Sequence, residues 1–268
     1  MEWIESMDDP RVAPYRSLRD RTLRGENIFV AEGRLVARRL LDSPYEAESV
    51  FVAEPWAEEF ERLAAGRVPV YVARESLLAG VVGFKFHLGV LAVGRRRRFM
   101  ALEEWMALLD PMDCLNLVIC PEITKPENMG LVFRTAGALG IDGVLLGERC
   151  CDPFSRRCLR VSMGSVLQVR FVKSENLAAD LRKLRQLWRP ELVAAVPDQP
   201  AERINQIQWS KRTGVLLGNE WGGLGPEWLA LCDRRVTIPM SPAADSLNLG
   251  VAAGIFMYEM RKATKGFS

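Results

Sequence analysis

Three segments in the C-terminal half of the chain combine polar residues with glycines where a strand is expected to give way to a helix. Residues 125–130 read KPENMG and are followed by Arg134. Residues 216–226 read LLGNEWGGLGP, with four glycines and one carboxylate, and residues 238–240 read IPM and lead to DSLN at 245–248. In open α/β sheets, ligands bind beyond the carboxyl ends of the strands. The segments therefore predict a ligand site built from amides, a carboxylate, a hydroxyl and a guanidinium.

Each segment also has a purely structural interpretation. Asn128 can cap a helix, and Arg134 can be a solvated surface residue. Glu220 can be an acceptor in a tight glycine turn, and Ser246 or Asp245 can cap the last helix. Neither G-x-G-x-x-G opening a long helix nor G-K-[ST] occurs, which argues against dinucleotide-binding and P-loop sites.

Composition removes other classes of protein. His87 is the single histidine, so a zinc site or a histidine-based triad lacks partners. The six cysteines form no C-x-x-C pair, and several lie in apolar runs, which favours a reduced, cytoplasmic protein. No stretch approaches the roughly 18 apolar residues of a membrane span, and the acidic N-terminus lacks a signal-peptide core. We expect neither a bound metal nor a membrane association.

The elements that position the three segments follow from apolar periodicity after Cys114. The predicted strands are 115–120, 143–147, 166–172, 192–196, 214–217 and 236–238, and the predicted helices are 128–139, 154–161, 177–188, 227–232 and 247–263. Strands that alternate with helices predict an α/β domain with a largely parallel sheet covered on both faces.

A second, smaller α/β unit precedes this domain. Its predicted strands are 28–31, 50–52, 68–72 and 88–93, its helices are 34–41, 57–65 and 75–79, and residues 11–24 are expected to form a basic helix. The four arginines at 95–98 and a short helical stretch at 102–109 favour a linker. The predicted organisation is therefore a domain at 1–100, a linker at 101–112 and a second domain at 113–268.

The order of the three segments resembles the SpoU (TrmH) family of RNA 2′-O-ribose methyltransferases in the SPOUT superfamily. The first family motif is similar to Asn128-x-Gly130 with Arg134, the second to residues 217–220 with Gly223-Leu224, and the third to residues 238–240 with 246–248. The SMGS sequence at 162–165 is similar to a small-residue segment of the family. Residues 29–36 resemble the start of a substrate-binding domain related to a ribosomal RNA-binding protein fold.

The resemblance implies a C-terminal domain with a deep trefoil knot, which is an exception to the rule against knots. It implies transfer of a methyl group from S-adenosylmethionine to a ribose 2′-hydroxyl. The implied cofactor-binding residues are Leu217, Gly218, Asn219, Gly223, Leu224, Ile238, Met240, Leu247 and Asn248. The implied catalytic residues are Arg134, Asn128, Glu220, Ser246 and Asn248.

Two points stay open within this resemblance. A guanidinium stays protonated in proteins, so we favour Arg134 as an electrostatic stabiliser of a phosphate or a developing alkoxide, with a general base as the alternative. Trp221 stands where family members often have glycine, and Gly250 where they often have serine. Both departures bear on the identity of the RNA more than on the reaction.

The RNA itself is expected to meet a basic surface of the first domain, because residues 11–39 hold eight arginines against three acidic residues. The predicted RNA-binding residues are Arg11, Arg16, Arg19, Arg21, Arg24 and Arg38. The two-domain layout favours ribosomal over transfer RNA, and a non-catalytic RNA-binding relative acting in ribosome assembly is a further alternative. The resemblance also implies a homodimer, in which the helix at 247–263 is either a contact surface or core.

Overall fold

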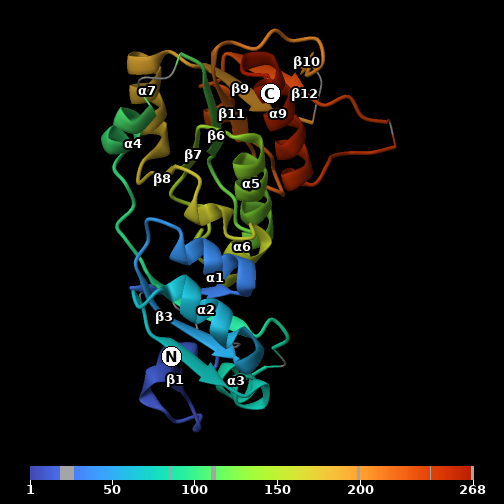
Figure 1. Ribbon diagram of the computed structural model, residues 1–268. Helices are drawn as coiled ribbons and strands as arrows, with labels where there is room; N and C mark the ends of the chain where they lie inside the picture. The colour runs from blue at the N-terminus through green and yellow to red at the C-terminus, as the bar shows by residue number, and fades with distance from the viewer. Residues whose placement is uncertain (19–26, 85, 110–112, 198–199, 242, 267–268) are drawn as a thin grey trace. The chain divides into compact units, whose positions relative to one another are not determined.

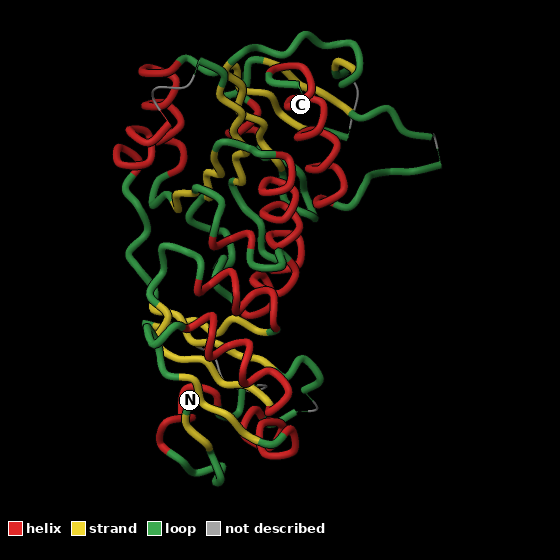
Figure 2. The backbone as a smooth tube through the Cα atoms, viewed as in Figure 1, coloured by secondary structure: helices red, strands yellow, loops and turns green. Residues whose placement is uncertain are grey.

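A computed structural model of the chain describes all residues except 19–26, 85, 110–112, 198–199, 242 and 267–268. The chain forms two compact units, each built on its own sheet (Figures 1 and 2). Unit one comprises residues 1–98 and 153–168, and unit two comprises residues 99–152 and 169–268. Unit one therefore takes in a segment from the C-terminal half of the sequence, which the predicted boundaries at 100 and 113 do not include.

Unit one is built on a mixed sheet with the strand order β1-β4-β3-β5-β2, in which β5 runs antiparallel to both of its neighbours. Its strands are β1 (Glu2–Trp3), β2 (Ile28–Glu32), β3 (Ala47–Ala53), β4 (Val70–Ala73) and β5 (Val90–Arg95). Its helical elements are η1 (Pro10–Tyr15), α1 (Arg34–Leu41), η2 (Glu54–Trp56), α2 (Ala57–Ala64), α3 (Glu75–Val82), α6 (Arg156–Val161) and η3 (Ser165–Leu167). The predicted α/β character of this unit is thus observed.

Segment 153–168 packs on unit one through aromatic and charged contacts. The Phe154 ring stacks on Phe29 with a centroid distance of 5.0 Å. Arg156 Nη2 lies 3.1 Å from Glu32 Oε1, and the Glu32 side chain is only 2% exposed. A carboxylate buried to that degree needs a cationic partner, and Arg156 supplies it from a position 124 residues later in the chain.

The sequence prediction of a strand at 166–172 is wrong in its first half. Residues 165–167 form the 3-10 helix η3, and the strand β8 begins only at Phe171. Gly164, with φ of +82°, turns the chain into η3, where Val166 and Leu167 are buried. A short apolar run predicts burial but does not by itself distinguish a strand from a helical turn.

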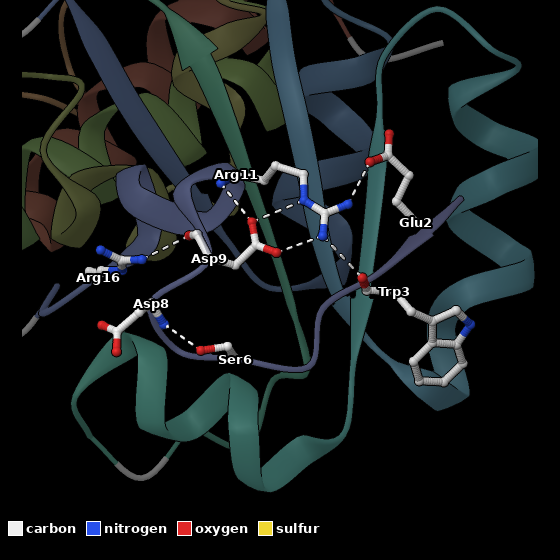
Figure 3. A network of polar contacts seen from close by, with 7 residues as sticks. All are labelled: Glu2, Trp3, Ser6, Asp8, Asp9, Arg11 and Arg16. Carbon is white, nitrogen blue, oxygen red and sulfur yellow. Dashed lines mark hydrogen bonds and ion pairs between the residues drawn. The ribbon is translucent and has the colours of Figure 1, made fainter.

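The basic helix predicted over residues 11–24 is also wrong within the described residues, which form only η1 (Pro10–Tyr15) there. Two prolines lie in this element, and proline restricts the backbone and removes a donor that an α-helix needs. Figure 3 shows what holds η1: the Arg11 guanidinium pairs with Asp9 at 2.6 Å and with Glu2 at 2.7 Å. Arg16 Nη2 donates to the Asp9 carbonyl at 2.8 Å, and Arg16 Nε donates to the Met7 carbonyl at 2.8 Å. These arginines tie η1 to the N-terminal segment.

Unit two is built on a seven-stranded sheet in the order β10-β12-β9-β11-β6-β7-β8, with every pair of neighbours parallel. Its strands are β6 (Leu115–Cys120), β7 (Gly143–Leu146), β8 (Phe171–Lys173), β9 (Glu191–Ala195), β10 (Glu202–Arg203), β11 (Arg212–Leu217) and β12 (Arg234–Thr237). Its helices are α4 (Leu102–Leu109), α5 (Pro126–Leu139), α7 (Leu177–Trp188), α8 (Pro226–Leu229) and α9 (Leu249–Thr264). The predicted parallel α/β sheet is confirmed.

Helices cover both faces of this sheet, with α4 and α7 on one side and α5 and α9 on the other (Figure 1). Leu117 and Ile119 of β6 share a buried cluster with Trp105 of α4 and Leu184 of α7. Asn116 faces the opposite side of β6, where its Nδ2 donates to Thr264 Oγ1 of α9 at 2.8 Å. Coverage on both faces is what a parallel sheet requires.

Helix α4 lies in the interval that the sequence suggested as a linker at 101–112. Its residues Leu102, Trp105, Met106 and Leu109 are buried in the core of unit two. The helical stretch predicted at 102–109 is thus observed with the same bounds, and its buried apolar face makes it part of the core of unit two rather than a linker.

Helices α5 and α9 pack side by side with their N-termini at the same end. A Cβ added to Gly250 of α9 would lie 2.6 Å from Leu131 Cδ1 of α5, and Gly254 lies opposite Thr135. Serine at position 250, frequent in the family that the sequence resembles, would collide with Leu131 here. The close approach of the helices therefore accounts for the departure at Gly250.

Candidate active site

A pocket of about 810 Å³ opens at the carboxyl ends of four neighbouring strands, β12, β9, β11 and β6. Ligands bind at this edge of open parallel sheets, and the volume lies within the usual range of small-molecule sites. The loops after these four strands and the start of α9 line the pocket with residues Lys125, Glu127, Asn128, Ala195, Val196, Pro197, Leu217, Gly218, Asn219, Glu220, Trp221, Gly222, Gly223, Leu224, Leu229, Ile238, Met240, Ser246, Leu247, Asn248, Leu249, Ala252 and Phe256.

The loop after β11 is closed upon itself. Asn219 N donates to the Gly223 carbonyl at 3.0 Å, and Gly223 N donates back to the Asn219 carbonyl at 3.2 Å. A Cβ on Gly218 would lie 2.3 Å from the Gly223 carbonyl carbon and 2.5 Å from Leu224 N. Because no side chain fits there, Gly218 lets the two arms of the loop touch and exposes backbone to the pocket.

Three polar side chains from three different loops join at the pocket. Asn128 Nδ2 donates to Glu220 Oε1 at 2.7 Å, and Asn248 Nδ2 donates to Asn128 Oδ1 at 3.1 Å. Asn248 Oδ1 in turn accepts from Gly250 N at 2.9 Å and caps α9. The cap of α9 is therefore Asn248 and not Ser246, and Asn128 lies inside α5 rather than at its N-cap position. The Asn248 side chain also belongs to this polar chain.

The second carboxylate oxygen of Glu220 lies outside this chain of hydrogen bonds. Among the described residues, Glu220 Oε2 is buried and has no hydrogen-bond partner. Buried polar atoms in native structures are almost always partnered, so this oxygen points to a ligand with a donor or a positive charge. Leu217, Ile238 and Leu247 form apolar walls of the same pocket.

The family of the chain follows from the residues that build this site. Residues 116–258, more than half of the chain, match the model of the SpoU rRNA Methylase family. The chain belongs to the SpoU family. The matched range begins in β6, ends in α9 and includes all three segments that carry the pocket.

Full-length relatives agree with this assignment. A protein of Mycobacterium bovis named as a tRNA/rRNA methyltransferase is 32% identical over 96% of this chain and 90% of its own length. The 23S rRNA (guanosine-2′-O-)-methyltransferase of Acinetobacter baylyi is 31% identical over 72% of this chain and 77% of its own. The crystal structure of an AdoMet-bound rRNA methyltransferase from Sinorhizobium meliloti superposes with a TM-score of 0.81 at 26% identity, covering 97% of both chains.

The structure brings together most of the residues predicted from the SpoU motifs. All nine predicted cofactor-binding residues line the pocket, and so do Asn128, Glu220, Ser246 and Asn248 of the predicted catalytic group. Their roles stay predictions, because the geometry gives positions only.

Arg134 is the exception among the predicted catalytic residues. It lies on α5 but does not line the pocket, and its side chain is exposed with no polar contact to any described residue. The expectation that Asn128 and Arg134 project into one crevice is not met within this chain. Six residues advance an α-helix by about 1.7 turns and about 9 Å, which turns Arg134 away from Asn128.

Sequence reasoning missed two parts of the pocket. The turn after β9, residues 195–197, lines it with apolar residues, and an apolar turn carries no polar signal of a ligand site in the sequence. Lys125 Nζ lies 5.0 Å from the centroid of the exposed Trp221 ring, and both residues line the pocket. The departure from the family at Trp221 was the available signal for this second feature.

The predicted RNA-binding arginines of unit one are largely engaged in other contacts. Arg11 pairs with Asp9 and Glu2, Arg16 donates to main-chain carbonyls, and Arg38 lies 3.8 Å from Glu59. Hydrogen bonds from Arg11 lower the pKa of Asp9 to about 2. Arg19, Arg21 and Arg24 lie outside the described residues. Binding of RNA at these arginines stays a prediction.

Metal and membrane features are missing from the part of the chain that the structure describes. No three His, Cys, Asp or Glu side chains there gather as metal ligands, and no helix there combines the length and apolarity of a membrane span. The six cysteines are free thiols. Burial raises the pKa of Cys150 to about 11 and of Cys232 to about 12, which disfavours the reactive thiolate.

Proposed function

We propose that this protein transfers a methyl group from S-adenosylmethionine to a ribose 2′-hydroxyl of ribosomal RNA. The observation that carries the proposal is the chain of hydrogen bonds Glu220–Asn128–Asn248 in the lining of a pocket that all nine predicted cofactor residues share. Membership of the SpoU family and the AdoMet-bound relative from Sinorhizobium meliloti support it.

The residues present fit the proposed cofactor. The Gly218 loop offers backbone groups at close range, and Leu217, Ile238 and Leu247 offer apolar walls for an adenosine. The unpartnered Glu220 Oε2 is a buried negative oxygen beside this space. When bound, S-adenosylmethionine supplies a methyl group on a positively charged sulfur, and a carboxylate is the protein group that favours such a charge.

The polar chain of the pocket orients the groups around the ribose. Asn128 is held at both ends of its amide, by Glu220 and by Asn248, so its side chain is fixed before substrate arrives. Fixed dipoles lower a barrier without reorganising during the reaction, and correct placement of the hydroxyl lowers it further.

Arg134 provides the positive charge in this proposal. Its guanidinium stays protonated and forms no polar contact with a described residue, so it is available to hold a phosphate or the developing alkoxide. Its exposed position on α5 is suited to meeting RNA from outside the pocket rather than the cofactor within it.

Ribosomal RNA and a homodimer complete the proposal. The Acinetobacter baylyi relative is named for 23S rRNA, which supports ribosomal over transfer RNA as the substrate of a reaction that we propose to be cytoplasmic. Val251 and Tyr258 of α9 are 51% and 46% exposed, and residues seven apart share one helix face. An apolar stripe beside α5 supports dimerisation through α9.

The proposal is tested with purified full-length protein and labelled S-adenosylmethionine. We expect label to enter ribosomal RNA that was isolated from cells lacking the gene. The label should enter at a single ribose that carries no 2′-O-methyl group in that RNA. Label in transfer RNA alone would show that transfer RNA is the substrate and would leave the proposed reaction unchanged. Failure to bind S-adenosylhomocysteine would leave the non-catalytic RNA-binding alternative.

A further inference from the structure

Trp221 is the most exposed large apolar side chain among the residues that the structure describes. Its side chain is 85% exposed, although it lines the catalytic pocket. Leaving an indole in water forgoes the burial of a large apolar surface. An exposed indole beside a pocket therefore indicates that a ligand covers the ring when it binds.

The backbone presents this ring on a rigid support. Asn219 Oδ1 accepts from Trp221 N at 3.0 Å and from Gly222 N at 2.7 Å. The mutual backbone bonds between Asn219 and Gly223 close the turn beneath it. The tip of the turn is therefore fixed at its base while the indole projects from it.

A cation stands against the ring. Lys125 Nζ lies 5.0 Å from the Trp221 ring centroid, a distance typical of cation–π pairs. Lys125 is the last residue before α5, so the ring and the ammonium come from different loops at the same pocket. Side by side they offer one aromatic face and one positive charge.

We propose that Trp221 and Lys125 form a recognition element for single-stranded RNA, in which the indole stacks on a nucleobase next to the methylated ribose and the ammonium contacts a neighbouring phosphate. This inference rests on the proposed RNA substrate. An aromatic face beside a cation is the usual means of holding unpaired nucleotides. An indole can bury about 150–250 Å², and one stacked nucleobase together with its phosphate on Lys125 would engage both groups of the element.

Binding of a fluorescein-labelled single-stranded RNA to full-length protein saturated with S-adenosylhomocysteine tests this element. We expect Trp221→Ala to weaken binding at least about fivefold, as loss of one stacked base does, and Trp221→Phe to retain most of it. A duplex of the same sequence, whose bases are already stacked, is expected to show no difference between wild type and Trp221→Ala. Lys125→Ala is expected to reduce the salt dependence of binding by about one phosphate contact, and Trp221→Ala to leave that slope unchanged.

Further variants separate stacking from other roles. Trp3→Ala removes an indole of unit one that is 49% exposed and does not line the pocket, and is expected to bind as wild type. Unchanged binding by Trp221→Ala, full binding by Trp221→Leu, or weaker binding of S-adenosylhomocysteine by Trp221→Ala would each overturn the element. If the wild type binds RNA through Trp221 but transfers no methyl group, the proposed function fails and the element stands. If it transfers methyl groups equally well without Trp221, only the element fails.

Discussion

The Asn128 amide nitrogen donates to Glu220 Oε1 at 2.7 Å across 92 positions of sequence. This bond joins the start of α5 to the loop after β11, and the Asn128 amide oxygen accepts from Asn248 at the start of α9. A flipped amide would direct its nitrogen at another amide nitrogen and its oxygen at a carboxylate. The orientation of Asn128 is thus determined by its two partners, which makes it the residue through which three loops depend on one another.

Asn128→Asp replaces the donor in this bond with a carboxylate oxygen facing Glu220. Because Asn128 is only 4% exposed, the repulsion is poorly screened. We expect the free energy of unfolding to fall by about 1–3 kcal/mol and methyl transfer to fall about a hundredfold or more. Denaturant titration and a transfer assay measure the two effects. Asn205→Asp, at an exposed position of unit two, is the matched control and should change neither.

Arg134→Ala tests whether the exposed guanidinium acts on RNA. We expect methyl transfer to fall about a hundredfold or more, while the affinity for S-adenosylhomocysteine stays unchanged because Arg134 does not line the pocket. Arg134→Lys keeps the positive charge but loses the planar guanidinium that can make two parallel hydrogen bonds. Its rate of methyl transfer is expected to lie between those of wild type and Arg134→Ala. Calorimetry and the transfer assay report these quantities, with exposed Arg182→Ala on α7 as control. Equal loss of cofactor binding and transfer would show that Arg134 is structural.

A charge placed in the exposed apolar stripe of α9 should separate the proposed dimer. Tyr258→Arg puts a cation where the proposed interface excludes water, and an unpaired buried charge is strongly unfavourable. Light scattering is expected to give the mass of a dimer for wild type and of a monomer for this variant. Leu187→Arg places the same charge on α7 at a site that is 62% exposed and should leave the mass unchanged. A monomeric wild type would contradict the proposal directly.

The local sequence pattern was sufficient to predict many helices and strands of unit two. The bounds predicted for α7, 177–188, and for β6, 115–120, are those observed, because each element carries a clear apolar period and its own end signals. The pocket residues could be predicted for a related reason. Parallel strands bring the loops after β6, β11 and β12 to one edge of the sheet, so residues far apart in the sequence lie together there.

What local pattern missed depends on partners distant in sequence. Phe154 and Arg156 belong to unit one through Phe29 and Glu32, and nothing near residue 154 indicates this. Likewise an arginine that contacts RNA and one that holds a neighbouring carboxylate have the same sequence signature, and Arg11 is of the second kind. The direction in which Arg134 projects depends on its rotation about the axis of α5. The rule that ligands bind beyond the ends of strands does not include that rotation.

The Asp9–Arg11 pair predicts an acid-dependent contribution to the stability of unit one. The pKa of Asp9 is lowered from 3.8 to about 2, chiefly by the side-chain hydrogen bond from Arg11. A lowered pKa in the folded state means that the contribution is fully present above pH 3.8 and is lost as the pH falls through about 2. The difference in Tm between wild type and Asp9→Asn should therefore be constant near neutral pH and shrink below pH 4. A difference that grows on acidification would contradict the assignment.

Gly218→Ala tests whether the closed loop after β11 forms the cofactor cradle. The added Cβ would lie 2.3 Å from the Gly223 carbonyl carbon and 2.5 Å from Leu224 N, and both are backbone atoms that cannot rotate away. The loop must open to admit it, so we expect an overpacking cost of about 1–3 kcal/mol in the free energy of unfolding. Affinity for S-adenosylhomocysteine, measured by calorimetry, should be lost with the loop geometry.

Gly222 in the same turn provides the control that separates geometry from composition. A Cβ on Gly222 would meet only Asn219 Oδ1, at 3.8 Å, which is ordinary contact. Gly222→Ala is therefore expected to keep both stability and cofactor affinity, although it lies four residues from Gly218 in the same pocket. If Gly218→Ala binds S-adenosylhomocysteine as tightly as Gly222→Ala, the cofactor does not depend on the closed loop, and its site must be sought among the apolar walls instead.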